Sequence, residues 1–396
     1  MIKYIDEILL KGKRVLMRVD INVPLDDSLN ITDDNRIRAS LPSIRYALGK
    51  GAKLIVCSHL GKPKGKRVEK LSLKPAAKRL SELLGKDVLF APDCIGEDVK
   101  KMAEGLSEGE VMLLENLRYH KGETENDPEL SKELASLAEV YINDAFAVSH
   151  RAHASVVGVT EFMDVCAAGF LLKNEIHYFK KALENPQRPM VAVLGGSKVS
   201  SKLAAIENIL PKVDRLIIGG AMANTFLLSE GYDMGKSLVE PDLVEKARGL
   251  MDQAQTTGKT IYLPKDFVVA EELKPDAETK TVPVEKIPSG YMALDIGPES
   301  KKIFGDAIKD AKTILWNGPL GAFEVDAFSK GTTSFAEKVG ESSALSIAGG
   351  GDTGAAIKKA GQTDNISYIS TGGGAFLELL EGKELPGIAA LKECAS

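Results

Sequence analysis

The sequence predicts an α/β protein with parallel sheets, in two domains joined by a long helix. The length, a recurring strand–turn–helix pattern and one amphipathic segment near the middle of the chain carry this prediction. At roughly 150 residues per domain, 396 residues are enough for two domains that each bury a core. The 37 glycines follow no collagen-like period, and they suit a fold with many tight turns between strands and helices.

Short apolar runs of strand length, each followed by a turn and usually a helical pattern, recur from end to end of the chain. This alternation is typical of βαβ units, whose parallel strands are covered by helices on both faces. The predicted strands are 15–19, 54–57, 111–114, 140–142, 190–194, 216–218, 313–316, 344–348 and 366–369.

The two halves are predicted to be connected by one helix. Apolar residues between 170 and 183 fall mostly on one helical face, and the pattern stops at Asn185-Pro186. The residues alone leave open whether the last segment packs on the second domain or returns to the first. The predicted divisions are a first α/β domain at 1–168, the connector at 169–185, a second α/β domain at 186–370 and a C-terminal segment at 371–396.

The composition excludes several classes of protein. With 51 basic and 56 acidic residues the net charge is -5, and a nucleic-acid partner is not expected because binding a polyanion needs a broad basic face. A membrane partner is not expected either, since no uncharged stretch reaches about 18 apolar residues. The scattered cysteines lack a C-x-x-C pair and zinc-ligand spacing, so we expect buried free thiols in a reducing cytoplasm. They are Cys57, Cys94, Cys166 and Cys394.

Polar and often cationic residues follow the predicted strands of the first half. Ligands of doubly wound sheets bind outside the carboxyl ends of the strands. Several cations converging there suit a small, multiply negative ligand such as a phosphorylated acid, because guanidinium groups match phosphate and carboxylate bidentately. Any one of these residues alone is equally compatible with a solvated loop. The set is Arg18, Asp20, Asn22, Arg36, Arg38, Ser58, His59, Gly61, Lys62, Glu115, Asn116, Arg118, Asn143, Asp144, His150, Arg151 and His153.

In the second half, the strand at 190–194 runs into the glycine turn Gly195-Gly196, which is predicted to open a helix. A helix N-terminus binds anions, and Lys198 and Lys202, four residues apart, would share one face beside it. This arrangement suits a polyphosphate. The pattern is not the Walker A loop G-x-x-x-x-G-K-[ST], so a P-loop enzyme is not expected.

The segment Gly349 to Gly354 satisfies the G-x-G-x-x-G pattern of a dinucleotide site. The next strand lacks the required acid, since it ends in Ser370-Thr371-Gly372. An aspartate in a phosphate-binding turn would repel phosphate unless a cation lay between them, so Asp352 is predicted to hold Mg²⁺ beside a nucleotide phosphate. A nicotinamide dehydrogenase and a purely structural turn are the alternatives.

Two further glycine turns follow predicted strands. Gly219 and Gly220 would let a flat base approach the backbone, and Glu324, in the turn after Trp316, can accept hydrogen bonds from ribose hydroxyls. Either turn taken alone is equally typical of an ordinary turn that connects a strand to a helix.

Together these motifs resemble phosphoglycerate kinases over essentially the whole chain. The resemblance implies two Rossmann-like domains joined by a helix, a C-terminal segment that packs back on the N-terminal domain, and a monomer. It also implies reversible, Mg²⁺-dependent phosphoryl transfer in glycolysis, in which 1,3-bisphosphoglycerate and ADP give 3-phosphoglycerate and ATP. Because the motifs are split over two domains, we expect hinge-bending closure. The matching stretches are 18–24, 58–63, 115–118, 143–146, 150–153, 195–202, 316–324, 349–353 and 371–374.

The resemblance also implies which residues form each site. Phosphoglycerate binding is implied for Asp20, Ile21, Asn22, Arg36, His59, Leu60, Gly61, Lys62, Arg118, His150 and Arg151. Nucleotide binding is implied for Lys202, Gly219, Gly220, Asn317, Pro319, Glu324, Gly350, Gly351, Asp352 and Thr353, with Asp352 on Mg²⁺. Stabilisation of the transferring phosphoryl group is implied for Arg36, Lys198, Gly372 and Gly373.

Two positions depart from the family pattern. Lys62 stands where the family usually has arginine, which keeps the charge and loses the bidentate fork. Ala221 replaces the third glycine of its turn, which narrows the expected adenine pocket. The alternative function is that of a nucleotide-binding protein without this transferase activity.

Overall fold

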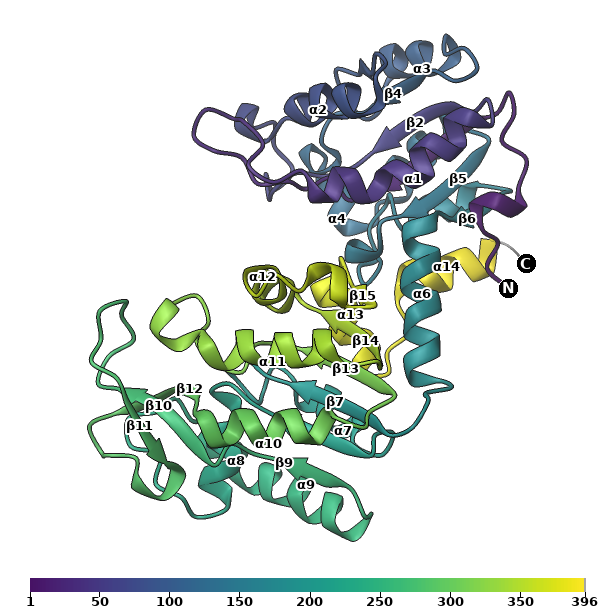
Figure 1. The fold of residues 1–396 in the computed structure, drawn as a ribbon. Helices are drawn as coiled ribbons and strands as arrows, with labels where there is room; N and C mark the ends of the chain where they lie inside the picture. Colours follow the sequence, from purple (N-terminus) through teal and green to yellow (C-terminus); the bar gives the residue numbers. More distant parts are fainter. Residues whose placement is uncertain (395–396) are drawn as a thin grey trace. The chain divides into compact units, whose positions relative to one another are not determined.

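The computed structural model describes residues 1–394 and divides the chain into two compact units. Unit 1 comprises residues 1–177 and the chain from 384 onward, and unit 2 comprises residues 178–383 (Figure 1). Each unit contains a six-stranded parallel sheet, so the predicted α/β class is confirmed. The boundaries predicted at 168, 185 and 370 stay a prediction. Residues 395 and 396 of the predicted C-terminal segment lie outside the described residues.

The sheet of unit 1 has the strand order β3-β4-β2-β1-β5-β6, and every pair is parallel. Its central strands are buried almost throughout, which explains why they are continuous apolar runs rather than alternating ones. The order places the carboxyl ends of β4, β2, β1 and β5 along one edge. The strands are β1 (Arg14–Val19), β2 (Lys53–Cys57), β3 (Leu89–Phe90), β4 (Val111–Leu113), β5 (Val140–Asp144) and β6 (Cys166–Ala168).

Two helices of unit 1 show how the sequence sets a helix boundary. Helix α5 has Pro128 in its first turn and Asp127 as its N-cap, where the carboxylate accepts the backbone N–H of Leu130. Helix α2 ends at Leu84 and is followed by Gly85, a C-cap residue in the left-handed conformation. The helices are α1 (Asn35–Gly49), α2 (Lys74–Leu84), α3 (Glu97–Glu104), α4 (Lys121–Glu125), α5 (Pro128–Ser136), α14 (Pro386–Cys394) and the start of α6 (Phe170–Leu183).

The N-terminus of α6 is anchored by Asp144 at the end of β5. Asp144 Oδ1 accepts hydrogen bonds from the backbone N–H groups of Leu171 at 2.9 Å and Leu172 at 3.2 Å. A Cβ atom at Gly169 would lie 2.2 Å from this oxygen, so only glycine fits there. Burial raises the pKa of Asp144 to about 6, and its Oδ2 has no hydrogen-bond partner within residues 1–394.

We expect Asp144→Asn to stabilise the protein by about 1–3 kcal/mol near pH 8, and the gain to vanish near pH 4. The folded-state pKa lies above the usual value of 3.8, so stability present at low pH is lost as the pH rises through about 6. The asparagine side chain keeps the Oδ1 acceptor but does not ionise, so the stability of the variant does not fall as the pH rises through about 6. Urea unfolding of both proteins at the two pH values measures the effect, and a difference that is the same at both would contradict it.

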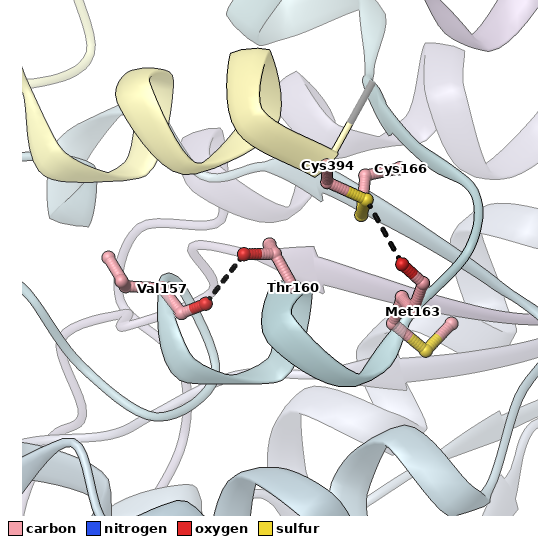
Figure 2. Close-up of a disulfide and its surroundings, with 5 residues drawn as sticks. All are labelled: Val157, Thr160, Met163, Cys166 and Cys394. Carbon is pink, nitrogen blue, oxygen red and sulfur yellow. Dashed lines mark hydrogen bonds between the residues drawn. A yellow bond between two sulfur atoms is a disulfide. The ribbon is translucent and has the colours of Figure 1, made fainter. Parts of the chain in front are cut away.

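Cys166 and Cys394 form a disulfide, so the prediction of four free thiols is wrong for this pair (Figure 2). Their Cα atoms lie 5.9 Å apart although 228 residues separate them in the chain. They meet because α14 packs beside β6, and Cys394 Sγ lies 3.3 Å from the carbonyl oxygen of Met163. The spacing of the cysteines along the sequence does not predict this pairing. Cys57 and Cys94 are free and buried, as predicted.

Reducing this disulfide is expected to lower the free energy of unfolding by about 3–5 kcal/mol, because the bond closes a very long loop in the unfolded chain. Denaturant unfolding with and without a dithiol reductant measures the change. Cys394→Ser is the control, since its transition should match that of the reduced protein and should not respond to reductant. An unchanged transition in the reduced parent protein would contradict the prediction.

The main sheet of unit 2 has the order β15-β14-β13-β7-β8-β9, again parallel throughout. An antiparallel sheet with the order β11-β10-β12 accompanies it, which the sequence pattern did not predict. The main strands are β7 (Met190–Leu194), β8 (Arg215–Ile218), β9 (Thr260–Tyr262), β13 (Thr313–Asn317), β14 (Leu345–Gly349) and β15 (Tyr368–Ile369). The antiparallel strands are β10 (Asp266–Ala270), β11 (Lys280–Pro283) and β12 (Met292–Ile296).

One predicted helix of unit 2 begins later than expected. The chain after Gly196 forms bends and turns as far as Lys202, and α7 starts only at Leu203. The prediction that Lys198 and Lys202 share a helix face is therefore wrong. The helices are the end of α6, α7 (Leu203–Ile209), α8 (Met222–Ser229), α9 (Val244–Thr256), α10 (Pro298–Ile308), α11 (Lys330–Glu341), α12 (Gly351–Lys359) and α13 (Gly373–Leu380). Within residues 1–394, none of the helices is long and apolar enough to span a bilayer.

Candidate active site

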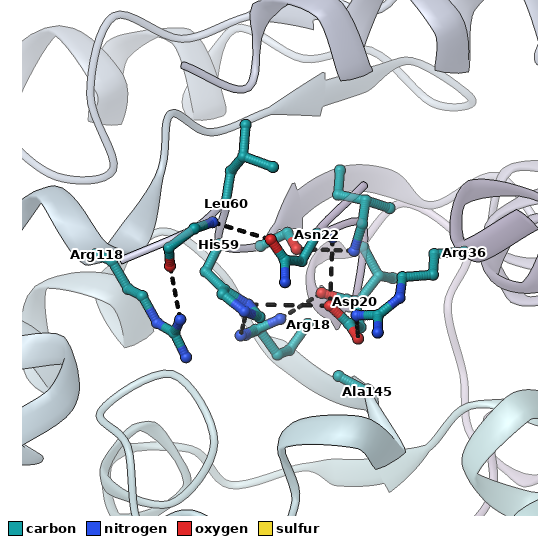
Figure 3. Close-up of polar contacts among 12 residues, drawn as sticks. Arg18, Asp20, Asn22, Arg36, His59, Leu60, Arg118 and Ala145 are labelled. Atoms are coloured by element: carbon teal, nitrogen blue, oxygen red, sulfur yellow. Dashed lines mark hydrogen bonds and ion pairs between the residues drawn. The ribbon is translucent and has the colours of Figure 1, made fainter. Parts of the chain in front are cut away.

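The carboxyl edge of the unit 1 sheet gathers the cationic residues that follow its strands (Figure 3). Arg36, in the first turn of α1, donates to the Asp20 carboxylate beyond β1 at 2.5 Å. Asn22 accepts the backbone N–H of Gly61 at 2.9 Å, and Arg118 donates to the Gly61 carbonyl at 2.7 Å. These contacts tie together the chain beyond β1, β2 and β4.

Arg18 and His59 form the buried base of this edge. The side chain of Arg18, in β1, is fully buried, and it donates to His59 Nδ1 at 3.1 Å. Burial and the charge of Arg18 hold the pKa of His59 well below its usual value, so the imidazole is neutral at pH 7. A neutral imidazole that accepts at Nδ1 carries its proton on Nε2. His59 is thus fixed as an N–H donor, which suits an anionic ligand.

A buried carboxylate balances the charge of Arg18 through a serine. Arg18 Nε donates to Ser155 Oγ at 2.9 Å, and the Ser155 hydroxyl donates to Glu123 at 2.7 Å. Glu123 is fully buried and also accepts the backbone N–H of Ser155 at 2.9 Å. A buried charge is tolerated when it is paired and hydrogen-bonded in this way. Sequence analysis missed Glu123 and Ser155, because neither belongs to a pattern that marks a ligand.

Surplus positive charge accumulates beside this network. Burial and the nearby guanidinium groups of Arg151 and Arg18 lower the pKa of Arg118 to about 10. Arg118 Nε is buried without a hydrogen-bond partner in the described chain. Burial and the guanidinium groups of Arg118, Arg18 and Arg151 also lower the pKa of His153 to about 3. Such crowding of cations is costly without a ligand and is relieved when an anion binds.

The remaining residues predicted for this edge take different positions. Arg151 donates to His150 Nε2 at 3.1 Å, so these two neighbours are linked to each other. Ile21 and Leu60 are buried, and their backbone N–H groups bond to Ser58 and Asn116, so they shape the loops rather than offer polar side chains. Lys62 is exposed.

At the carboxyl edge of the unit 2 sheet, three turns pack backbone against backbone. A Cβ atom at Gly195 would lie 2.0 Å from the carbonyl oxygen of Pro319, and one at Gly318 would lie 2.2 Å from that of Gly195. One at Gly220, which has φ +65°, would lie 2.6 Å from Gly196 N. Only glycine permits this approach. The turns after β7, β8 and β13 therefore form one closely packed surface.

Lys202 and Asn317 form the polar centre of this surface. Lys202 Nζ donates to the Asn317 side-chain oxygen, and to the Asn317 carbonyl at 3.1 Å. Burial lowers the pKa of Lys202 to about 8, although the negative charge of Asp352 acts in the other direction and raises it. Thr353, in α12, accepts the backbone N–H of Gly318 at 2.7 Å and thereby holds the helix start against this turn. The N-terminus of α12, a lysine and an amide converge, as a phosphate site requires.

The model of the phosphoglycerate kinase family matches residues 5–383. The chain belongs to the phosphoglycerate kinase family. It is 58% identical over 99% of its length to the phosphoglycerate kinase of Geobacter sp. (strain M21), covering 98% of that protein. It is 59% identical over 98% of its length to the phosphoglycerate kinase of Desulfotalea psychrophila, all of which is covered. The solved phosphoglycerate kinase of Coxiella burnetii superposes with a TM-score of 0.91 at 42% identity over the whole of both chains.

A second solved structure of this family supports the predicted α/β fold with parallel sheets. The phosphoglycerate kinase of Pyrococcus horikoshii OT3 has a TM-score of 0.86 at 33% identity, with 99% of both chains covered. As a member of the phosphoglycerate kinase family, the chain is a phosphotransferase that acts in glycolysis.

The other residues that the phosphoglycerate kinase motifs imply lie at or near the unit 2 edge. A Cβ atom at Gly373 would lie 3.4 Å from Gly350 Cα, so the N-terminus of α13 adjoins that of α12, and Gly372 directly precedes it. Gly219 packs against Leu320, where a Cβ atom would come within 2.4 Å of the side chain. The exposed residues of the set are Lys198, Glu324, Gly351 and Asp352.

The departure at Ala221 carries no backbone strain. Ala221 has φ -65° and is the N-cap of α8, a conformation that any residue adopts. The positive φ of this turn falls on Gly220 instead. Alanine is therefore compatible with the turn, and only its methyl group distinguishes it from the glycine of the family pattern.

Proposed function

We propose that this chain catalyses the reversible, Mg²⁺-dependent transfer of a phosphoryl group from 1,3-bisphosphoglycerate to ADP, as a cytoplasmic monomer. The observation that carries the proposal is the cationic edge of unit 1. There Arg18, neutral His59 and Arg118 lie together, and Arg118 has a buried donor with no hydrogen-bond partner among residues 1–394. A small acid with a phosphate and a carboxylate matches these groups.

Phosphoglycerate is assigned to the edge beyond β1, β2 and β4. Arg118 and Arg36 supply guanidinium groups, and His59 supplies an N–H donor whose orientation Arg18 sets. Asp20 holds Arg36 in place and, as an acceptor, is suited to a hydroxyl of the ligand. We assign Asn22, His150 and Arg151 to the same pocket, and Lys62 to its exposed rim.

The nucleotide is assigned to the edge of unit 2. Its phosphates suit the N-termini of α12 and α13 and the ammonium of Lys202, while its base suits the glycine surface at Gly219 and Gly220. Asp352, in the first turn of α12, is an exposed carboxylate close enough to interact with Lys202, and a hard oxygen ligand of this kind fits Mg²⁺. When bound, Mg²⁺ neutralises phosphate charge.

The chemistry requires positioning and charge rather than a general base. Both acceptors, a carboxylate and a diphosphate, are already anionic. In unit 1, Arg36 supplies positive charge for the phosphoryl group of the bound acid. In unit 2, Lys198 and the N–H groups at Gly372 and Gly373 supply it for the phosphates of the nucleotide. Prearranged donors of this kind do not have to reorganise during the reaction.

The test is phosphorylation of 3-phosphoglycerate by ATP, coupled to reduction of the acyl phosphate formed. We expect turnover that requires Mg²⁺ and is lost when glycerate, which lacks the phosphate, replaces 3-phosphoglycerate. Binding of ATP without turnover would instead support a nucleotide-binding protein without transferase activity. Light scattering tests the oligomeric state, and a mass of twice one chain would contradict the monomer.

A further inference from the structure

Unit 1 holds a second cluster of ligand-type side chains that the proposed function does not use. Asp93 and Cys94 follow β3, and His120 directly follows the short helix η3 (Leu117–Tyr119). Each offers one ligand atom, and the three atoms all lie within 4.8 Å of one another. Residues 27 positions apart in the chain thus converge on one point.

The cluster is held in place by its own contacts. His120 Nε2 lies 2.6 Å from Asp93 Oδ1, and the same oxygen accepts the backbone N–H of Cys94 at 2.7 Å. The Cys94 thiol donates to the carbonyl of Glu115 at 3.4 Å. Cys94 is fully buried, while the side chains of Asp93 and His120 are 42% and 29% exposed. A buried thiol with a carboxylate and an imidazole that reach solvent gives an ion both a soft ligand and a path of entry.

The donor set decides which ion fits. Mg²⁺ and Ca²⁺ prefer oxygen ligands, whereas sulfur, imidazole nitrogen and carboxylate oxygen together are the ligands of Zn²⁺. Bond lengths of about 2.0–2.3 Å place the ligand atoms of a tetrahedral site roughly 3–4 Å apart, so small side-chain movements bring these three into range. Three protein ligands leave a fourth position for water.

The surrounding charge is compatible with a cation. The Arg67 guanidinium lies close by, since it donates to the carbonyl of Pro92, the residue before Asp93, at 3.0 Å, and it also lies 3.9 Å from the buried Glu115 carboxylate. Since Glu115 offsets Arg67, the carboxylate of Asp93 remains as uncompensated negative charge when His120 is neutral.

We propose that Asp93, Cys94 and His120 form a Zn²⁺-binding site, separate from the Mg²⁺ that accompanies the nucleotide. On binding, the metal bonds to Cys94 Sγ, a nitrogen of His120 and an oxygen of Asp93. The thiol proton passes to the buffer; a protonated His120 also releases one proton, whereas a neutral His120 keeps its proton on the ring nitrogen that does not bind the metal. The ion would clamp the residues after β3 to the end of η3, the helix that carries Arg118.

The experiment is calorimetric titration of the chelator-treated full chain with Zn²⁺, without nucleotide, together with Co²⁺ absorption as a reporter of thiolate ligation. We expect one ion per chain, a thiolate-to-cobalt charge-transfer band, and an affinity at least about 100-fold lower in Cys94→Ala. His120→Gln, at a partly exposed position, should also weaken binding and should fold normally.

Cys57→Ala is the matched control, because it removes the other free buried thiol and should keep both the affinity and the cobalt band. Asp352→Asn should keep them as well, which separates this site from the nucleotide metal. The proposal is overturned if Zn²⁺ does not bind, if Co²⁺ binds without the thiolate band, or if Cys94→Ala and His120→Gln bind as tightly as the parent protein. None of these readouts depends on phosphoryl transfer, so the proposed function stands or falls separately.

Discussion

Arg36→Ala is expected to lower kcat for phosphoryl transfer by about 10²–10³-fold while the affinity for ADP stays near that of the parent protein. The Arg36 side chain is 43% exposed at the start of α1, and the ion pair with Asp20 fixes its position. It therefore offers a preorganised positive charge to phosphoglycerate and to the transferring group. Because the nucleotide edge belongs to unit 2, removing this charge should not disturb ADP binding.

Arg38→Ala is the matched control for this variant. Although the sequence placed Arg38 in the cationic set, it lies two residues further along α1, is exposed, and pairs with Asp34 four residues before it. An exposed pair of this type contributes little to stability, so the control should retain full turnover. Initial rates at saturating substrates and calorimetric binding of ADP give both readouts. A collapse of ADP binding in Arg36→Ala would assign this residue to the nucleotide.

Lys202→Met is expected to raise the Kd of ADP by about 100-fold, since one charge-assisted contact to phosphate is worth about 2–3 kcal/mol. The ammonium of Lys202 is held by Asn317 beside the glycine surface, and the methionine fills nearly the same space without a charge. The binding of 3-phosphoglycerate should not change. Calorimetric titration with each ligand measures the two affinities.

Lys212→Met provides the comparison for Lys202→Met. Lys212 Nζ also bonds to an asparagine side chain, Asn208, at 3.0 Å, and its position after α7 is not among the predicted site residues. ADP should bind this control as it binds the parent protein. Equal ADP affinity in Lys202→Met and the parent protein would remove Lys202 from the nucleotide site.

The sequence was sufficient to predict the parallel sheets and the place of the cationic edge. Buried parallel strands are continuous apolar runs, and the residues that follow them share one edge whatever the strand order. Hence Asp20, His59 and Arg118 could be placed near one another without knowing which strands are neighbours. Glu123 and Ser155 were not predicted, because a buried counter-charge is recognisable only once the burial of Arg18 is known.

Other features depend on contacts that no local pattern records. The helix expected after Gly196 is delayed because Glu240 accepts both the backbone N–H and the hydroxyl of Ser200, which competes with helical hydrogen bonding. The exposed strand β11 has no apolar run that would mark it. The disulfide pairs Cys166 with a residue 228 positions away. Each case is decided by tertiary structure.

The composition of unit 1 from two distant stretches of chain affects how the protein is made. The ribosome completes the whole of unit 2, residues 178–383, before it adds α14. Domains generally fold as units during synthesis, so unit 2 can fold while unit 1 still lacks its last helix. Until Cys394 leaves the ribosome, Cys166 has no partner, and the surface of β6 that α14 covers stays open to solvent or to chaperones. Unit 1, whose first residues are synthesised before unit 2, is therefore completed after unit 2.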